Sequence, residues 1–185
     1  MSLFEFVTVM ISMILALCLG QLLRSASYLA KTDRDVIAYR PYALWFVFIF
    51  LTVIHHWWSL WDLQDIDWNY TSFLYVLIAP VLITFVAGLI TPDRIASGAI
   101  DIPAHFSNVR KLFSKISVAY AIVMWFDGPL LAGQDVLGIV GIMHLPIISA
   151  LLVPWFSGSD RVNIAAASVA IAALVVVAAV RLTSM

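Results

Sequence analysis

Six apolar runs, most of them about twenty residues long, recur along the chain and constrain its fold more than any other feature. They cover approximately residues 3–23, 42–61, 70–90, 116–131, 136–156 and 162–182. A helix needs ~20 apolar residues to cross the hydrocarbon core of a bilayer, whereas a strand of a membrane β-barrel uses only ~10. The chain is 63% hydrophobic and 11% charged, against ~25% charged residues in soluble domains, so lipid must cover this apolar surface. We therefore predict an all-α integral membrane protein, with residues 1–185 forming a single domain of six transmembrane helices.

Proline, glycine and mixed polarity predict where these helices bend or end. Pro80 predicts a kink in the third helix, because proline removes one backbone hydrogen bond. Asp127-Gly128-Pro129 predicts a break near the end of the fourth helix. Residues 95–113 mix apolar and polar side chains, so we expect part of this connection to lie along the membrane surface as an interfacial helix.

The basic residues predict the orientation. The connections after the first, third and fifth runs hold 4, 4 and 1 of the 10 Lys and Arg residues, and Arg181 alone lies on the opposite side. Positively charged connections stay in the cytoplasm. We therefore expect a multi-pass protein of the bacterial inner membrane with both termini on the outer, periplasmic face.

Tryptophans and aspartates cluster where the second run ends. The tryptophans are Trp57, Trp58, Trp61 and Trp68, and the aspartates are Asp62, Asp65 and Asp67. Indole rings prefer the boundary between lipid and water. The tryptophans are therefore interpreted as interface anchors, and the aspartates as a solvated outer turn.

Five ionisable residues fall in the outer half of the predicted bundle, whereas the inner half is nearly free of ionisable groups. They are Glu5, His55, His56, Asp127 and His144. Such groups at membrane depth cost several kcal/mol unless they are paired, hydrated or neutral, so they should face the bundle interior. We therefore predict an outward-facing polar cavity or cluster formed by some of these residues.

Each member of this cluster also has a simpler interpretation. His144 is also compatible with a neutral histidine that only forms a hydrogen bond, Asp127 with a cap on a helix break, and Glu5 with a solvated helix end. Adjacent residues on a helix point ~100° apart, so only one of His55 and His56 can face a given axis.

Three functions are compatible with this pattern. The first is an ion or proton pathway lined by histidine and carboxylate groups that narrows toward the apolar inner half. The second is a non-catalytic accessory or structural subunit of a larger membrane complex. The third is a haem, metal or quinone site, because His55 and His144 on different helices are suited to ligation. No cofactor is predicted outright.

The chain contains no motif that is typical of other classes of function. The sequence has no Ser/His/Asp arrangement, phosphate-binding glycine loop or metalloprotease motif, so an enzyme is not expected. The basic connections do not indicate nucleic-acid binding, because the positive-inside rule already explains them.

Small residues on the sixth run predict close helix packing. They form two pairs spaced four residues apart, Ala166 with Ala170 and Ser168 with Ala172. Such spacing lets helix backbones approach closely. The partner is either another helix of this chain or a second membrane subunit, so a homo-oligomer or a hetero-complex is expected.

The aromatic second run with His55-His56 resembles the second helix of bacterial relatives of the lysosomal potassium channel, which are also small six-helix proteins. The chain also resembles small six-span bacterial membrane proteins without an assigned activity. The channel resemblance implies a tetrameric pore gated by apolar side chains of the first helix. The residues that this implies here are Ile11, Leu15 and Leu19.

Overall fold

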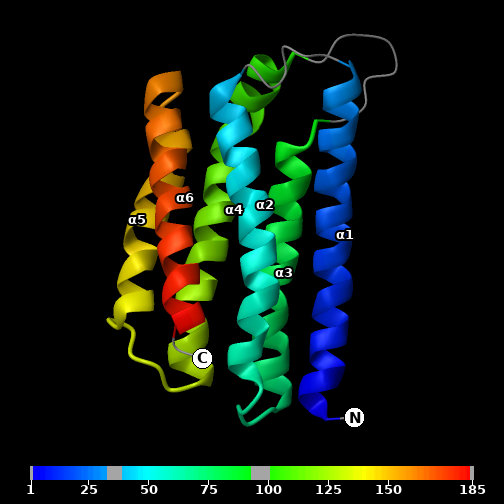
Figure 1. Ribbon diagram of the computed structural model, residues 1–185, viewed down its shortest axis with the longest axis vertical. Coiled ribbons are helices and arrows are strands. Elements are labelled where there is room, and N and C mark those ends of the chain that lie inside the picture. Colours follow the sequence, from blue (N-terminus) through cyan, green and yellow to red (C-terminus); the bar gives the residue numbers. More distant parts are fainter. Residues whose placement is uncertain (1, 33–38, 93–100, 184–185) are drawn as a thin grey trace.

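The computed structural model describes residues 2–32, 39–92 and 101–183, and nearly all of them are helical. The elements are α1 (Leu3–Thr32), α2 (Arg40–Ser59), the 3-10 helix η1 (Leu60–Leu63), α3 (Tyr70–Ile90), α4 (Ile102–Leu131), α5 (Ile139–Phe156) and α6 (Asp160–Thr183). The helices run side by side as a bundle, and the start of α1 and the end of α6 lie toward the same end (Figure 1). We call this the termini end and the opposite one the basic end. The predicted all-helical fold is confirmed.

Five helical segments are long and apolar enough to cross a membrane, counted over the described residues: α1, α2 with η1, α3, α5 and α6. The helix α4 is not among them, because Lys115 and Asp127 interrupt its apolar half. Several such helices in one bundle are the architecture of a multi-pass membrane protein.

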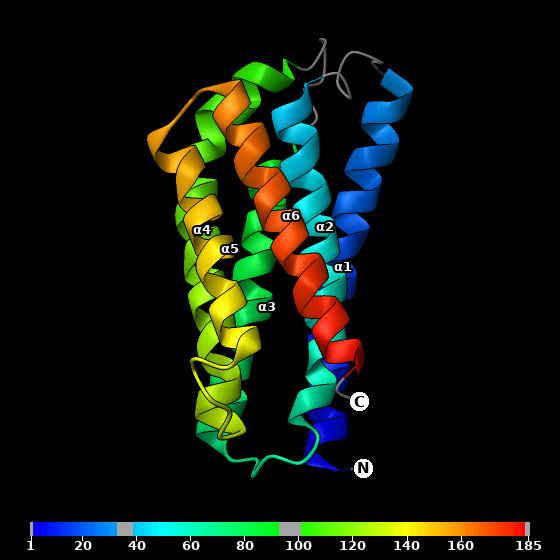
Figure 2. The same cartoon turned by 60° about the vertical axis from the view of Figure 1, so that its left-hand side comes forward.

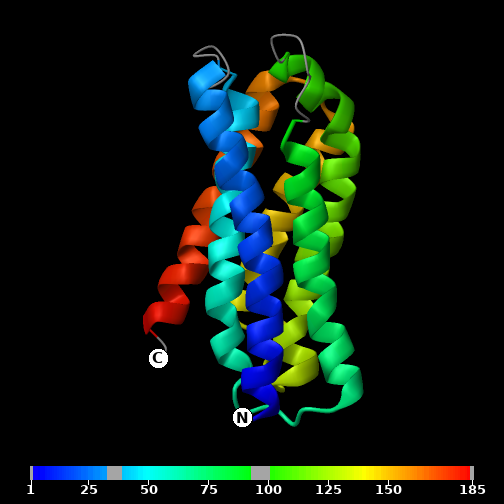
Figure 3. The ribbon, with the colours of Figure 1, turned by 90° about the vertical axis from the view of Figure 1, so that its right-hand side faces the viewer.

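The helices form a closed ring around a shared core. Helix α1 packs on α3, α3 on α4, α4 on α5, α5 on α6 and α6 on α2. Helix α2 also contacts α1, α3 and α4, so it closes the ring (Figures 2 and 3). A cluster at one end of α2 therefore reaches several other helices.

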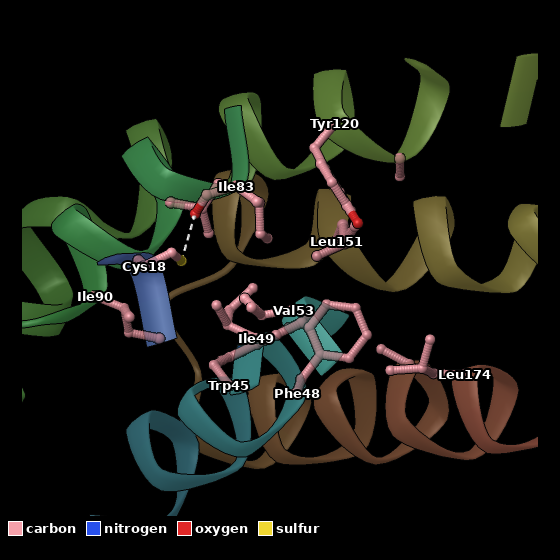
Figure 4. Close-up of a cluster of buried hydrophobic side chains, with 14 of the residues drawn as sticks. Cys18, Trp45, Phe48, Ile49, Val53, Ile83, Ile90, Tyr120, Leu151 and Leu174 are labelled. Atoms are coloured by element: carbon pink, nitrogen blue, oxygen red, sulfur yellow. Dashed lines mark hydrogen bonds between the residues drawn. The ribbon is translucent and has the colours of Figure 1, made fainter. Parts of the chain in front are cut away.

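Aromatic rings fill the centre of this core. Trp45 is fully buried, and its ring meets those of Phe48 and Phe113 edge-on, with centroids 5.7 Å apart in both cases. The Cys18 thiol donates to the carbonyl of Ile83, 3.9 Å away (Figure 4). The single cysteine is therefore a packing residue.

Side chains and prolines define where the helices begin. The Asn69 side chain accepts from the N–H groups of Thr71 and Ser72, and the Asn69 N–H donates to the Ser72 hydroxyl, which forms a capping box for α3. The Asp101 carboxylate accepts from the Ala104 N–H at the start of α4. Pro41 occupies the first turn of α2, where its missing N–H costs nothing.

The predicted break at Asp127-Gly128-Pro129 is wrong, because α4 continues to Leu131. Proline removes only one helical hydrogen bond, and neighbouring helices support the backbone at this depth. The helix ends at Leu131, and Gly133, two residues further, has φ +62° and lets Ala132 and Gln134 both donate to the Gly128 carbonyl. Helix α3 is continuous through Pro80, and the kink there stays a prediction.

Two helices extend further toward the basic end than predicted. Arg24 and Lys31 lie within α1 rather than in a connection. Residues 102–113, predicted in part as an interfacial helix, are continuous with α4, and its first turns lean across the basic end (Figure 2). Residues 95–100 of that prediction lie outside the described part of the chain. Extra turns on α1 and α4 therefore carry basic side chains beyond the apolar segments.

Polar contacts hold the basic end together. The Tyr39 hydroxyl donates to the Asp160 carboxylate at 2.8 Å, and Arg110 donates to the Pro154 carbonyl at 2.6 Å. Burial and the Asp160 carboxylate raise the pKa of Tyr39 to about 12. These contacts join the starts of α2 and α6 and the adjacent parts of α4 and α5.

Candidate functional site

Seven polar side chains from five elements converge near the termini end. We call them the polar cluster: His55 and His56 of α2, Asp62 of η1, Tyr120 and Asp127 of α4, His144 of α5, and Arg181 of α6. The ring order of the helices places α2, α4, α5 and α6 around this region. The structure therefore brings together four of the five predicted residues and adds three that were not predicted.

Arg181 is the charged centre of the polar cluster. Its guanidinium donates to the Asp62 carboxylate at 2.5 Å, and the two side chains are 15% and 28% exposed. It is also an electrostatic neighbour of His55, Asp127 and His144. The Asp62 carboxylate offsets the charge of this partly buried guanidinium.

His56 has a structural partner. Its Nδ1 and the Tyr120 hydroxyl form a hydrogen bond of 3.0 Å, and their side chains are 2% and 7% exposed. Tyr120 projects from α4 into the space between the helices (Figure 4). Of the two adjacent histidines, His56 therefore faces α4, while His55 lines the hollows described below.

His144 is oriented by its own helix. Its Nδ1 lies 2.9 Å from the Val140 carbonyl, which can only accept, so Nδ1 carries the proton. In the neutral ring Nε2 is then the free acceptor. The ring stacks on Trp125, with centroids 6.4 Å apart and an interplanar angle of 4°, and the Trp125 indole donates to the Val136 carbonyl. The imidazole is thus held with one nitrogen available.

Three hollows meet at the polar cluster. The loop hollow, of about 240 Å³, lies between the end of α4 and the start of α5 and reaches from Gln134 and Asp135 to His144 and Arg181. The inner cavity, of about 40 Å³, is lined by His55, Tyr120, His144 and Arg181 among others. The lateral groove, of about 300 Å³, lies between α2 and α6 and includes His55.

The hollows share walls. His144 and Arg181 line both the loop hollow and the inner cavity, and His55 lines both the inner cavity and the lateral groove. A buried site for water requires polar partners and at least ~10–15 Å³, so the inner cavity has room for a few water molecules at most. It is far smaller than the ~300–1,000 Å³ of ordinary ligand pockets. The space between His55 and His144 does not accommodate a haem.

An apolar layer closes the inner cavity toward the basic end. Its members are Phe48, Phe113, Leu151 and Leu174, all of them buried. Each lies seven residues toward the basic end from a cluster residue of the same helix, namely His55, Tyr120, His144 and Arg181. Seven residues are two helical turns, or ~10 Å. The same helix faces thus change from polar to apolar at one depth.

The remaining predicted cluster residues differ in their surroundings. Asp127 is half-buried and is an electrostatic neighbour of Arg181 and Asp62. Glu5 is exposed at the start of α1, where it exchanges two hydrogen bonds with Ser2. Asp127 therefore belongs to the polar cluster, whereas the described contacts of Glu5 are those of a helix cap.

Three of the four predicted interface anchors line a further hollow, between α1 and the end of α2. Trp57, Trp58 and Trp61 are 53%, 44% and 59% exposed and line a hollow of about 510 Å³ with residues of α1. The Trp57 indole donates to the Ser12 hydroxyl at 3.0 Å. Trp68 is half-buried. Three exposed indoles at the termini end fit a position at a lipid–water boundary.

The residues implied by the channel resemblance pack in the hydrophobic core of the bundle. Ile11 and Leu15 are 0% and 3% exposed, and Leu19 packs against the same core. Of the small pairs on α6, Ala166 and Ala170 are buried within the chain. The other pair, Ser168 and Ala172, is exposed on the outer face of the helix. Of the two pairs, only Ser168 and Ala172 are exposed on the surface of the chain.

Three residues of the polar cluster were not predicted from the sequence: Asp62, Tyr120 and Arg181. Arg181 carried a signal, because it is the lone basic residue on the side that the positive-inside rule leaves free of them. Asp62 was interpreted as part of a solvated turn, and the structure corrects this interpretation. Tyr120 carried no signal that distinguishes it from a core aromatic.

Comparisons of the chain with models of known protein families, with curated proteins and with solved structures gave no match. Within the described ranges there is also no group of three or more His, Cys, Asp or Glu side chains placed to hold a metal ion. The geometry of the polar cluster therefore carries the functional argument.

Proposed function

We propose that the chain is a six-span protein of the bacterial inner membrane in which the polar cluster forms the outer half of a proton pathway. The single observation that supports this function is the series of hollows that share His144, Arg181 and His55 as walls. Through these shared walls, polar side chains occur at intervals from the α4–α5 connection to Tyr120.

The sixth span in this proposal is α4. It has 30 residues, which corresponds to ~45 Å, and it packs between α3 and α5, both of which are long and apolar enough to cross the membrane. A helix with two such neighbours on its flanks crosses with them. The positive-inside rule then places the basic end in the cytoplasm and both termini outside.

Volume favours protons over larger ions. A hydrated cation needs several water molecules around it, and the inner cavity of about 40 Å³ holds at most a few. A proton needs only a chain of hydrogen-bonding groups. His144 Nε2, the Tyr120 hydroxyl and the His55 ring are groups of this kind around one small cavity.

The charges suit this role as well. Asp62 offsets Arg181, and Asp127 adds a second carboxylate near the same guanidinium, so no unbalanced cation faces the histidines. Beyond the cavity, the apolar layer acts as the closed gate, since hydrophobic constrictions exclude water until they widen. An assembly of subunits or a helix movement supplies the opening.

Proton flux into proteoliposomes tests the proposal. A potassium diffusion potential drives protons, and a dye inside the vesicles reports the pH. We expect His144→Ala to reduce flux at least tenfold and Leu151→Ser, which hydrates the apolar layer, to increase it. His105→Ala is the matched control, because His105 bonds to Leu89 at the basic end.

Near-ultraviolet circular dichroism checks that each variant is folded. The proposal would be overturned if the wild type and Leu151→Ser are both folded and neither gives a proton flux above that of empty vesicles. A His144→Ala flux equal to that of wild type would also overturn it.

A further inference from the structure

The lateral groove joins the polar cluster to the lipid-facing side of the bundle. Its walls are Leu51 and Ile54 of α2 and Leu174, Val175 and Ala178 of α6. Ile54 and Val175 are 44% and 55% exposed, so the groove opens outward rather than into the core. A lipid-soluble molecule can therefore enter it from the bilayer.

One imidazole and one indole are the polar features of this groove. His55 lies at its inner side and also faces the inner cavity, and Trp58, 44% exposed, lies one turn nearer the termini end. Among the described residues that line the groove, none carries a fixed charge. The groove thus favours an uncharged head that can form a hydrogen bond and pack against an aromatic ring.

Depth separates two classes of membrane molecule. His55 lies four residues before the end of α2, or ~6 Å along the helix, on the core side of the exposed tryptophans. The phosphate of a phospholipid stays outside the hydrocarbon core. Arg181, the nearby cation, lines the inner cavity rather than the groove and is paired with Asp62. A phosphate head is therefore disfavoured at His55.

We propose that the lateral groove binds an isoprenoid quinone, with one ring oxygen hydrogen-bonded to His55. Its volume of about 300 Å³ lies at the lower end of ordinary ligand pockets and suits one ring with the first part of its tail. The apolar walls hold the tail, and Trp58 packs on the ring. This assignment rests on the proposed function, because the inner cavity then links the bound ring to water.

Binding of decylubiquinone to the purified protein in nanodiscs tests the assignment without any proton gradient. Quinones quench indole fluorescence, so we expect saturable quenching that Trp58→Phe reduces and Trp68→Phe leaves in place. His55→Leu should weaken binding at least tenfold, and His55→Gln, which keeps a hydrogen-bonding group, should restore part of it.

A steric variant and its control complete the test. Val175→Phe fills the groove and should abolish saturable quenching, whereas Val169→Phe, at another exposed position of α6, should not. Three results would each overturn the assignment. The wild type shows no saturable quenching, His55→Leu binds the quinone as tightly as the wild type, or dioleoyl phosphatidylglycerol at the same concentration displaces the quinone. A wild-type protein that conducts protons but binds no quinone refutes this inference alone. A wild-type protein that binds quinone but conducts no protons refutes the proposed pathway alone.

Discussion

The ion pair between Asp62 and Arg181 should couple the end of α6 to η1 by a measurable free energy. Exposed ion pairs contribute ~0.2–1 kcal/mol, whereas removing one partner of a fully buried pair costs ~3–5 kcal/mol. The side chains are 28% and 15% exposed, between these limits, and their atoms lie 2.5 Å apart. We therefore expect a coupling free energy of ~1.5 kcal/mol, about tenfold in the folding equilibrium constant.

A double-mutant cycle isolates this coupling, because it removes the effects that each substitution has by itself. Asp62→Asn, Arg181→Met and the double variant are unfolded thermally in nanodiscs at one fixed scan rate. The double variant should be more stable than the sum of the two single effects predicts, by ~3–6 °C in Tm for a chain of this size.

Asp65 supplies the matched control for this cycle. It is exposed on the connection that follows η1, so Asp65→Asn combined with Arg181→Met should be additive. If the Asp62 cycle is also additive within ~0.3–0.5 kcal/mol, the pair does not hold Arg181 in the polar cluster, and the geometry of the inner cavity needs another explanation.

Three further predictions concern single contacts and are checked by unfolding measurements. Tyr120→Phe removes the partner of the buried His56 ring and should cost ~1 kcal/mol, and adding His56→Phe should cost less than the two single effects summed. Gly141→Ala should destabilise by ~2–3 kcal/mol because a Cβ there collides with the Val136 carbonyl, whereas Gly20→Ala, with open space, should stabilise by ~0.5–1 kcal/mol. The pKa of Tyr39 is about 12 in the folded chain against 10.0 ordinarily, so stability should fall as the pH rises from 10 to 12, and Tyr39→Phe should flatten that fall.

The sequence predicted the helices well and their ends less well. An apolar run of about twenty residues can cross a bilayer only as a helix, because a helix satisfies its backbone hydrogen bonds within the segment. The prediction of an all-helical bundle was reliable for this reason. The end of the fourth helix at residue 131 was predicted correctly, but the break at Asp127-Gly128-Pro129 was wrong, because the helix continues through Pro129. Gly133 follows that end, and its left-handed backbone is visible only in three dimensions.

The polar cluster was predicted in part for a related reason. Depth along each helix can be read from residue numbers, so His55, Asp127 and His144 were placed at a common level. The direction in which a side chain points depends on helix rotation, which the sequence does not provide. For this reason the partner of His56 and the pairing of Arg181 emerge only from the packing of α2, α4 and α6.

Contact between water and the inner cavity is the central claim of the proposed pathway. Water-edited solid-state NMR on histidine-labelled protein in liposomes measures the transfer of magnetisation from water to each imidazole. His55→Asn and His144→Asn assign the signals.

We expect rapid transfer to His144 and His55, which line the inner cavity, and little transfer to His56, which is buried against Tyr120. A His55 signal that builds up no faster than that of His56 would show that water does not reach the cavity, and it would contradict the pathway.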